Sequence, residues 1–445
     1  MPYYTPLQIK LGTTMENVRK YFEAITQIPH CSHHAEALRD MLVEHARERG
    51  YRVEVDGADN ILIYRGRPRL CLQAHYDMVC MGKAPRIETY EEGGWLKAHE
   101  ASLGADNGVA VAMMMALMDS ALALEFLLTA DEEVGLVGAK ALEFPLYSDY
   151  MLNLDFEAEA EVCIGCAGGA DIVASKKGLL VAGSGTCYEV SVKGLAGGHS
   201  GVDIDKGIPS AIKLLGEYLY AKGVTQIASL YGGERGNSIP ANAVAIVRSE
   251  TALEDEGRVT VRTLETRPSV YQEDERLVEM IHRFRHGVRR VSETLGIPHS
   301  SINLAIITAD AEGRMQIETS ARAMEMDALS QITEETVGFF QGYGLDTLVQ
   351  DKYPAWKPET NRFTALVGAH MQAVFGRSHT TAIHAGLECG ILSQKYPDIR
   401  FASIGPTIRY PHSSREMVNL KSVEDTYAVL GRIVSDVELG VDIDL

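Results

Sequence analysis

The sequence predicts an α/β protein whose chain is interrupted by an inserted α+β domain. Apolar runs with strand character alternate with helical patterns up to about residue 184 and again from about residue 355. That alternation is typical of a sheet covered by helices. Residues 187–193 instead alternate apolar and polar side chains, as a half-buried antiparallel strand does. At 445 residues the chain is also too long for one compact core. We expect residues 1–184 and 355–445 to form one domain and residues 185–354 the inserted one.

The first part of the chain shows helical and strand patterns in turn. We expect helices over 13–28 and 33–49, where Thr13 or Thr14 can cap the first and Gly50 ends the second. The expected strands are 51–55, 61–64, 70–74, 124–130 and 150–154, with a further helix from about 137. The helix that ends near 118 is apolar nearly all round, so it should be buried. Residues 83–100 are expected to be irregular, with a turn at Gly93-Gly94.

The inserted region alternates strands with helices before the α/β pattern resumes. Its expected helices are 207–222, 272–295 and 324–342, and its expected strands are 187–193, 225–231, 243–249, 258–264, 301–307 and 314–320. Residues 353–358 are expected to be a linker. After it we expect helices at 361–375, 387–395 and 421–438 and strands at 380–384 and 400–404. Both ends of the chain would then share one domain, which is reasonable because insertions are tolerated at loop tips.

Composition and charge argue against several classes of partner. The formal net charge of −19 disfavours binding to nucleic acid or to an anionic membrane surface. No apolar run reaches the length of a transmembrane helix, so we expect no membrane partner. We also expect no secretory signal, because no basic segment precedes an apolar one near residue 1. The seven cysteines are odd in number and scattered, so we expect reduced thiols and a cytoplasmic protein.

Acidic and imidazole side chains recur where predicted strands end or helices begin. His75 and Asp77 follow a short apolar strand, and in open α/β sheets ligands bind at the carboxyl ends of the strands. The others at such places are Asp106, Glu132, Glu133, Asp155 and His412. Each of these residues also has an ordinary structural explanation when it is considered alone. His75 can be a satisfied core histidine, Asp106 a helix cap, and residues 131–133 a solvated loop.

Taken together, these nitrogen and oxygen donors suit zinc best, with manganese or cobalt possible. Structural zinc sites rely on cysteine, and none of these positions is a cysteine. The set is also larger than one tetrahedral ion needs, whereas two ions sharing a carboxylate would use it. Such a pair can polarise a carbonyl and activate a water. Of the two adjacent glutamates, one can then bind a metal while its neighbour serves as general base.

Six stretches of the sequence resemble the di-zinc metallopeptidases, a group of aminoacylases, glutamate carboxypeptidases and dipeptidases. They are Leu72-Gln-Ala-His75-Tyr-Asp77-Met-Val79, Gly104-Ala-Asp106-Asn-Gly108, Thr129-Ala-Asp-Glu132-Glu133-Val-Gly135, Leu152-Asn-Leu-Asp155, Gly197-Gly-His199-Ser-Gly201 and Pro411-His412-Ser413. Three further features resemble the cytosolic aminoacyl-histidine dipeptidases of the peptidase D type. These are Ile164-Gly-Cys-Ala-Gly-Gly169, the large inserted domain and Gly405-Pro-Thr-Ile-Arg409.

The resemblance implies a three-layer α/β/α zinc-peptidase domain with an inserted α+β domain that serves as lid and dimerisation domain. It implies two zinc ions per subunit. The residues that would hold the first ion are His75, Asp106 and Asp155, and those for the second are Asp106, Glu133 and His412. Asp77 would orient His75, and Glu132 would be the general base.

The resemblance also implies residues that contact a small peptide substrate. His199 would bind the substrate and its oxyanion, often across a homodimer formed through the inserted domain. Asn237 would bind the substrate as well. Arg322 is a candidate for the substrate carboxylate, and Glu388 for its free amino group.

Three positions depart from the family pattern, namely Tyr76, Phe156 and the Ser-Ser-Arg that follows His412. None removes a ligand, so they bear on substrate preference more than on catalysis. We therefore expect hydrolysis of dipeptides, of the Xaa-His type and more broadly. The alternatives are a related aminoacylase, tripeptidase or carboxypeptidase with the same metal core, or a catalytically idle binding protein. An idle relative should have lost a ligand or Glu132, and this sequence retains both.

Overall fold

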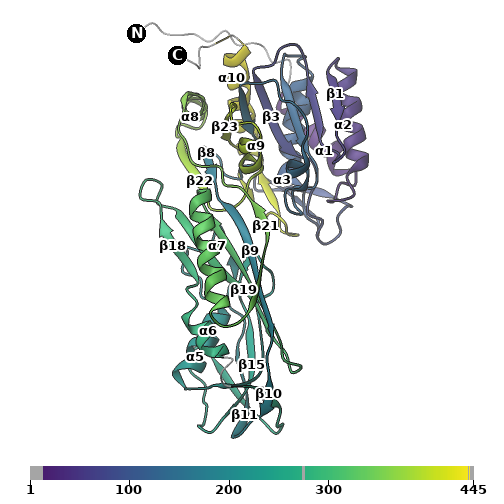
Figure 1. The fold of residues 1–445 in the computed structure, drawn as a ribbon. Coiled ribbons are helices and arrows are strands. Elements are labelled where there is room, and N and C mark those ends of the chain that lie inside the picture. Colours follow the sequence, from purple (N-terminus) through teal and green to yellow (C-terminus); the bar gives the residue numbers. More distant parts are fainter. Residues whose placement is uncertain (1–13, 273–275, 439, 441–445) are drawn as a thin grey trace. The chain divides into compact units, whose positions relative to one another are not determined.

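The computed structural model describes residues 14–272, 276–438 and 440, and these divide into two compact units (Figure 1). The first unit comprises the chain up to Gly165, Pro358–Ala382 and the chain from Leu387, and the second comprises Cys166–Lys357 and Ile383–Gly386. The boundary expected at residue 185 thus lies about 20 residues earlier. The reason is strand β9 (Gly168–Lys177), which pairs along its whole length with β20 (Arg314–Ala323) of the second unit.

A mixed sheet forms the middle of the first unit. Within the described residues its eight strands lie in the order β1 (Arg52–Val55), β2 (Ile61–Tyr64), β6 (Glu125–Thr129), β3 (Leu70–His75), β7 (Tyr150–Asn153), β23 (Arg400–Ser403), β8 (Glu161–Cys166) and β22 (His379–Ile383). β3 runs parallel to both β6 and β7. The carboxyl ends of these three strands therefore meet at one edge of the sheet.

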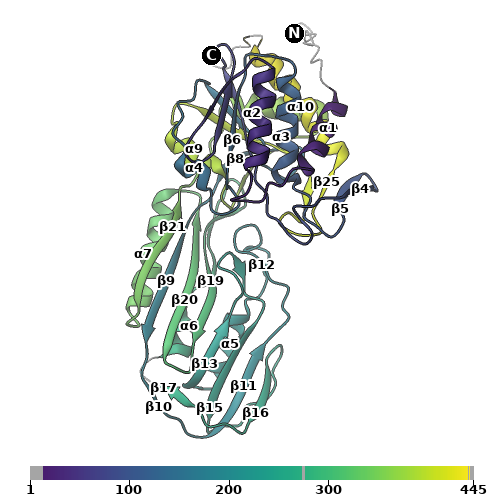
Figure 2. The ribbon, with the colours of Figure 1, turned by 90° about the vertical axis from the view of Figure 1, so that its right-hand side faces the viewer.

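Helices cover both faces of this sheet. One apolar core joins a face of the sheet to α1 (Met15–Thr26), α2 (Glu36–Glu48), α3 (Ala105–Met118), α8 (Arg362–Phe375) and α10 (Leu420–Glu438). Helices α4 (Val137–Ala141) and α9 (Glu388–Lys395) lie on the opposite side (Figure 2). Every residue of α3 is buried, as its all-round apolar pattern predicts. The unit is thus a three-layer α/β/α structure, and the predicted fold class is confirmed. None of the helices in the described ranges is long and apolar enough to cross a membrane.

The stretch expected to be irregular, residues 83–100, contains a β-hairpin. Strands β4 (Thr89–Glu92) and β5 (Trp95–Ala98) pair across the predicted glycine turn. β5 also pairs with β25 (Met417–Asn419), which pairs with β24 (Ile408–Arg409). The hairpin is stabilised by pairing with β25, a strand more than 300 residues away in sequence, so local composition gave little sign of it.

The second unit is built on an antiparallel sheet. In the described part of the chain its order is β16 (Thr260–Leu264), β11 (Thr186–Val192), β15 (Ala243–Ser249), β13 (Gln226–Gly232), β19 (Pro298–Ala309), β20, β9 and β21 (Asp346–Tyr353), with β18 (Gly287–Val291) beside β19. Helices α5 (Ala211–Ala221), α6 (Leu277–Arg283) and α7 (Met326–Gln341) share a core with this sheet (Figure 1). Two short ribbons accompany it, β10 (Leu180–Ala182) with β17 (Ser269–Tyr271) and β12 (Gly198–His199) with β14 (Ser238–Ile239).

The single helix expected over residues 272–295 is wrong. Residues 273–275 lie outside the described residues, α6 ends at Arg283, and β18 follows it. Phe284 is already extended, and Gly287 has φ of +101°, a value that no helix accommodates. The residues after Gly287 pair with β19 instead.

The expectation that all seven cysteines are reduced is also wrong. Cys31 and Cys80 form a disulfide, while the other five cysteines are buried and form no disulfide within the described residues. Cys31 forms an isolated parallel bridge with Met78, which brings its backbone beside the segment that carries Cys80. The two cysteines are 49 residues apart in sequence, so their spacing alone did not reveal the pairing.

Candidate metal centre

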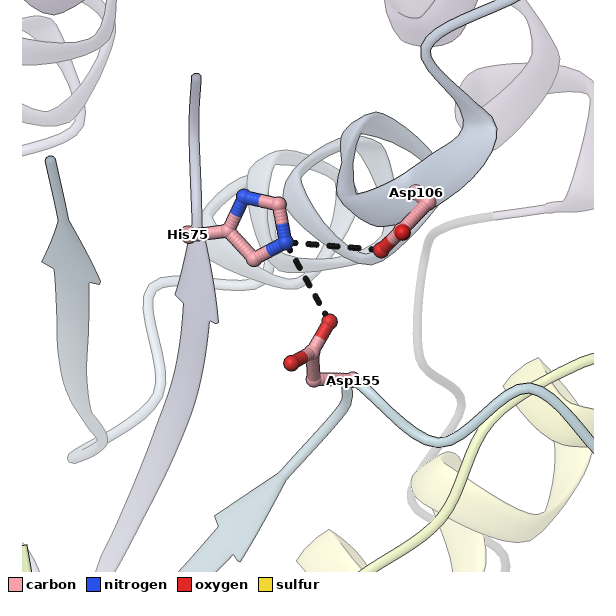
Figure 3. A group of neighbouring side chains, drawn as sticks. All are labelled: His75, Asp106 and Asp155. Carbon is pink, nitrogen blue, oxygen red and sulfur yellow. Dashed lines mark ion pairs between the residues drawn. The ribbon is translucent and has the colours of Figure 1, made fainter. Parts of the chain in front are cut away.

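Three potential metal ligands meet beyond the carboxyl end of β3 (Figure 3). His75 ends that strand, Asp106 lies in the first turn of α3, and Asp155 follows β7. The Nε2 atom of His75 lies 3.4 Å from Asp106 Oδ1 and 3.3 Å from Asp155 Oδ1. Ligand atoms about 2.0–2.2 Å from one ion are separated by distances of this order. These three residues can therefore hold a single ion.

A second group shares Asp106 with the first. His412 Nε2 lies 3.1 Å from Asp106 Oδ2 and 2.9 Å from Glu133 Oε2. The ligand atoms of these three side chains all lie within 4.8 Å of one another. Asp106 thus turns one oxygen toward His75 and the other toward His412. That is the arrangement a carboxylate needs to bridge two ions.

The donor set fits divalent cations in its chemistry. All the donors are imidazole nitrogens or carboxylate oxygens, which suit zinc and also manganese or cobalt. Glu133 Oε1 is buried and has no hydrogen-bond partner among the described residues. A buried carboxylate oxygen without a partner is costly unless a cation satisfies it. His75, Glu132 and Glu133 form a further group of ligand atoms of the same kind.

Without cations, the imidazoles and carboxylates offset one another's charge. Burial alone would lower the pKa of His412, but its hydrogen bonds and ion pairs with Asp106 and Glu133 raise it to about 11. Burial likewise opposes the charge on His75, yet Asp155 and Asp106 raise its pKa well above the usual value. Burial raises the pKa of Asp155 to about 6, with the charges of Asp106 and Glu133 adding to the effect. The imidazoles that would bind ions therefore favour a bound proton when no cation is present.

Asp77 acts on the site through two different parts of the residue. The Nδ1 atom of His75 lies 3.0 Å from the backbone carbonyl of Asp77 and 3.6 Å from its carboxylate. The carbonyl therefore accepts the Nδ1 proton and leaves Nε2 facing the metal ligands. The carboxylate instead accepts the backbone N–H of Glu132 at 3.0 Å and the hydroxyl of Ser32 at 2.6 Å. Asp77 thus positions both His75 and Glu132.

Glu132 has the environment of a proton acceptor. Burial raises the pKa of Glu132 well above its usual value, and the nearby charges of Asp155 and Glu133 raise it further, while His75 acts in the opposite direction. A carboxylate whose pKa is raised in this way is suited to accept a proton near neutral pH. Its ligand-type oxygen lies in one group with His75 and Glu133, so it is next to the potential metal ligands.

Glu388 is the first residue of α9 and is fully buried. Its Oε2 accepts hydrogen bonds from Gln73 Nε2 at 2.5 Å and from Thr129 Oγ1 at 2.6 Å. Its Oε1 is buried and has no partner among the described residues. Burial raises the pKa of Glu388 to about 7, and the charge of Asp155 contributes to the increase. One oxygen of this buried carboxylate is thus left unsatisfied close to the metal ligands.

The remaining predicted residues belong to the second unit. His199 ends the short strand β12, and its Nδ1 accepts the backbone N–H groups of Gly201 and Val202 at 3.1 and 3.3 Å. These bonds place the proton of the neutral ring on Nε2. Asn237 is exposed, and its backbone carbonyl accepts the N–H of Ser200.

Arg322, also in the second unit, is buried near the end of β20. It donates from Nη1 to the Tyr353 hydroxyl at 2.6 Å, while its Nε has no partner within the described ranges. His384 is buried in the same unit and hydrogen-bonds the Ser301 hydroxyl through Nε2 at 2.8 Å. Burial and the charge of Arg322 lower the pKa of His384 to about 3, so that it stays neutral.

Sequence reasoning missed Glu416, which is buried and bonds to the backbone around Asp106. Its carboxylate accepts N–H groups from four successive residues, Leu103, Gly104, Ala105 and Asp106. Burial raises the pKa of Glu416 to about 7, and the charge of Asp106 contributes, although the N–H bonds favour the ionised form. The only sequence signal was its place four residues after His412.

The fold and site together define an α/β protein with an inserted domain and a buried cluster of potential metal ligands. Comparison with known proteins then identifies the family to which the chain belongs. Residues 71–436 match the sequence pattern of peptidase family M20/M25/M40. The chain is also 31% identical over 470 residues to the cytosol non-specific dipeptidase of Escherichia coli (strain K12), covering 94% of this chain and 96% of the relative. The chain therefore belongs to the M20/M25/M40 peptidase family and is a hydrolase that acts on peptide bonds, as the resemblance of its motifs predicts.

Solved structures are consistent with this assignment. The aminoacylhistidine dipeptidase of Vibrio alginolyticus is 28% identical and superposes with a TM-score of 0.80, covering 96% of this chain and 97% of that one. A tripeptidase from Staphylococcus aureus has a TM-score of 0.61 at 15% identity, over 96% of this chain and 99% of that one, and shares the fold.

Proposed function

We propose that the protein is a dipeptidase that uses two divalent ions, zinc or else manganese or cobalt, to hydrolyse dipeptides, including those of the Xaa-His type. The observation that carries the proposal is the position of Asp106 between His75 and His412. The dipeptidase activity is supported by the names of the relative from E. coli and of the similar structure from V. alginolyticus.

Each residue of the metal centre has a defined part in this proposal. His75, Asp106 and Asp155 would hold one ion, and Asp106, Glu133 and His412 the other. When bound, the ions would polarise the peptide carbonyl and lower the pKa of a water. Glu132 takes a proton from the attacking water and later gives it to the leaving amine. Asp77 keeps Glu132 in place by accepting its backbone N–H.

Four residues are proposed to bind the peptide substrate. Glu388 would use its unsatisfied Oε1 to bind the free amino group, since a buried carboxylate oxygen favours a cationic partner. Arg322 would bind the carboxylate, because its Nε is buried without a partner in the described part of the chain. His199 would donate its Nε2 proton to the oxyanion, a role supported by its fixed tautomer. Asn237 would contact the substrate from the loop beside Ser200.

We further propose a homodimer formed through the inserted domain, with neither nucleic acid nor membrane as a partner. His199 would act across that dimer. Mixing the two inactive variants His199→Ala and Glu132→Gln tests this role. Recovery of activity on subunit exchange would show action across the dimer, whereas no recovery would assign His199 to its own subunit.

A cytoplasmic location is part of the proposal and is supported by the name of the E. coli relative. The Cys31–Cys80 disulfide stands against it, because disulfides rarely persist in the cytosol of mesophiles. Labelling of thiols in intact cells, followed by mass spectrometry of both cysteines, decides whether the bond exists where the protein works.

The activity is tested on a peptide panel before and after chelation and addition of zinc or manganese. The panel holds β-Ala-His, other Xaa-His dipeptides, ordinary dipeptides, tripeptides and N-acyl amino acids. We expect dipeptides alone to be cleaved, and only with metal present. Cleavage of tripeptides or N-acyl amino acids instead would indicate a related peptidase or aminoacylase. Binding of two ions without any cleavage would indicate a binding protein.

A further inference from the structure

Glu416 is a buried acidic residue to which the proposed reaction gives no role. Its side chain is 3% exposed and lies just before β25. Oε2 accepts the N–H groups of Leu103 at 2.8 Å and Gly104 at 3.0 Å, and Oε1 accepts those of Ala105 at 2.8 Å and Asp106 at 3.2 Å. Both oxygens are thus engaged by backbone donors, so Glu416 has no oxygen left over for a substrate or an ion.

The backbone that Glu416 binds begins α3, where N–H groups lack helical partners. Four successive donors converge on one carboxylate because Gly104 is left-handed, with φ of +69°. A side chain at this position would also collide with its surroundings, since its Cβ would lie 2.9 Å from Met78 Sδ. The loop is therefore shaped to receive a carboxylate, and Asp106 is the last residue in it.

Glu416 also belongs to the turn that carries His412. Its N–H donates to the carbonyl of Ser413 at 3.1 Å, and the Ser413 hydroxyl donates to the carbonyl of Tyr410 at 2.7 Å. Tyr410 and His412 both have φ of +55°, so the turn has an unusual backbone that these bonds hold. The backbone of Glu416 is thus fixed to the turn that carries His412, and its carboxylate is fixed to the loop that carries Asp106.

We propose that Glu416 is a positioning residue that sets Asp106 and His412 at the separation required by the second ion. The inference rests on the proposed two-ion site. The two ligands come from segments 306 residues apart, yet their side chains lie 3.1 Å from each other. The contacts of Glu416 connect those same two segments directly. Its hydrogen bonds go to the backbone N–H of Asp106 and to the carbonyl of Ser413 beside His412, so it acts through the backbone segments that carry the two ligands.

Glu416→Gln tests this role with nearly the same side-chain shape. An amide has one accepting oxygen, and its NH2 group would face two of the four N–H donors. Loss of a group that orients metal ligands typically lowers metal affinity about 10- to 100-fold. We expect a fall of that size for the second equivalent of zinc or cobalt, measured by competition with a chromophoric chelator. The first equivalent should change less, and KM should stay within about twofold when metal is saturating.

Glu125 provides a matched control in the same unit. It is buried at the start of β6, at the opposite end of that strand from Glu132, and accepts the backbone N–H groups of Tyr147 and Ser148. Glu125→Gln should therefore lower the melting temperature of the metal-free protein without weakening metal binding. Glu416→Asp keeps the charge on a shorter side chain and should bind metal more tightly than Glu416→Gln. It also provides a second variant to titrate if Glu416→Gln fails to fold.

Two results would overturn the inference. One is Glu416→Gln binding two ions as tightly as the wild type, and the other is Glu125→Gln losing as much metal affinity as Glu416→Gln. The titration needs no substrate, so it separates this inference from the proposed reaction. If the wild type binds two ions but cleaves no peptide of the panel, the dipeptidase proposal is wrong. The titration still decides the role of Glu416 in that case.

Discussion

Asp106 and His412 lie 306 residues apart in sequence, and the Oδ2 atom of the first is 3.1 Å from the Nε2 atom of the second. Asp106 is the second residue of α3, whereas His412 lies in the loop before β25. The second unit of the protein is inserted between them in the chain. The second group of ligands therefore forms only when both halves of the first unit have folded together, which couples metal binding to folding of that unit.

Glu132→Gln separates metal binding from proton transfer. The amide keeps the shape of the side chain and cannot accept the proton of the attacking water. Both ions should therefore still bind, because the five proposed ligands are unchanged. We expect kcat to fall about 10²- to 10⁴-fold, the usual contribution of a general base. Steady-state kinetics, together with a measurement of metal content, checks this prediction. Near-normal turnover with two bound ions would show that another group takes the proton.

Binding of metal to the apoprotein should release protons. The pKa of about 11 for His412 means that its ring is charged at pH 7 without an ion, and an ion can bind only the neutral ring. Asp155, with a pKa of about 6, must also be ionised to act as a ligand. Apparent metal affinity should thus rise with pH between about 5 and 8, because protons compete less at higher pH.

Calorimetry in buffers of different ionisation enthalpy measures this release. The binding enthalpy should depend on the buffer, with a slope that corresponds to more than one proton released at pH 7. His412→Ala removes one titrating ring and should reduce the slope. A binding enthalpy that is the same in every buffer would contradict the charged state assigned to His412.

Glu388→Gln tests recognition of the substrate amino group. Gln can still accept the hydrogen bonds of Gln73 and Thr129 through its oxygen, so the fold should persist. It loses the negative charge that would bind an ammonium group. Hydrogen bonds to charged groups contribute about 1.5–3 kcal/mol, so KM for dipeptides should rise at least about tenfold while kcat changes less. An unchanged KM would show that Glu388 serves only the buried network with Gln73.

Much of the site was predictable because strand ends are visible in the sequence. His75 and Asp155 follow apolar runs that became β3 and β7, and these strands are parallel neighbours. Their carboxyl ends therefore meet, as expected for an α/β sheet. Most strand and helix positions of the first unit followed from the same local patterns, whereas β4, β5 and β8 were not predicted.

Features that depend on contacts distant in sequence were not predictable in this way. The hairpin of β4 and β5 needs β25 as a neighbour, and the carboxylate of Glu416 needs the loop before α3. The part of Asp77 that orients His75 is its carbonyl, whereas the motif suggested the carboxylate. Which oxygen a ring nitrogen meets depends on backbone geometry beyond the strand, and residue type alone does not determine it.

The Cys31–Cys80 disulfide is expected to stabilise the first unit. It closes a loop of 49 residues, and restriction of the unfolded chain by a loop of that size is worth about 4 kcal/mol. The bond also holds the segment with Ser32, whose hydroxyl donates to Asp77 at 2.6 Å. The double variant Cys31→Ser/Cys80→Ser should therefore unfold at lower denaturant concentration than the wild type, with the slope of the transition increased if its unfolded state is more open.

Reductant supplies the control for this prediction. Dithiothreitol should destabilise the wild type to the level of the double variant and leave the variant itself unchanged. Thiol counting on denatured, unreduced protein should find five reactive groups, because the other five cysteines form no disulfide in the described part of the chain. Seven reactive thiols, together with a stability that reductant does not alter, would show that Cys31 and Cys80 are reduced and that the segment around Ser32 is held by its hydrogen bonds alone.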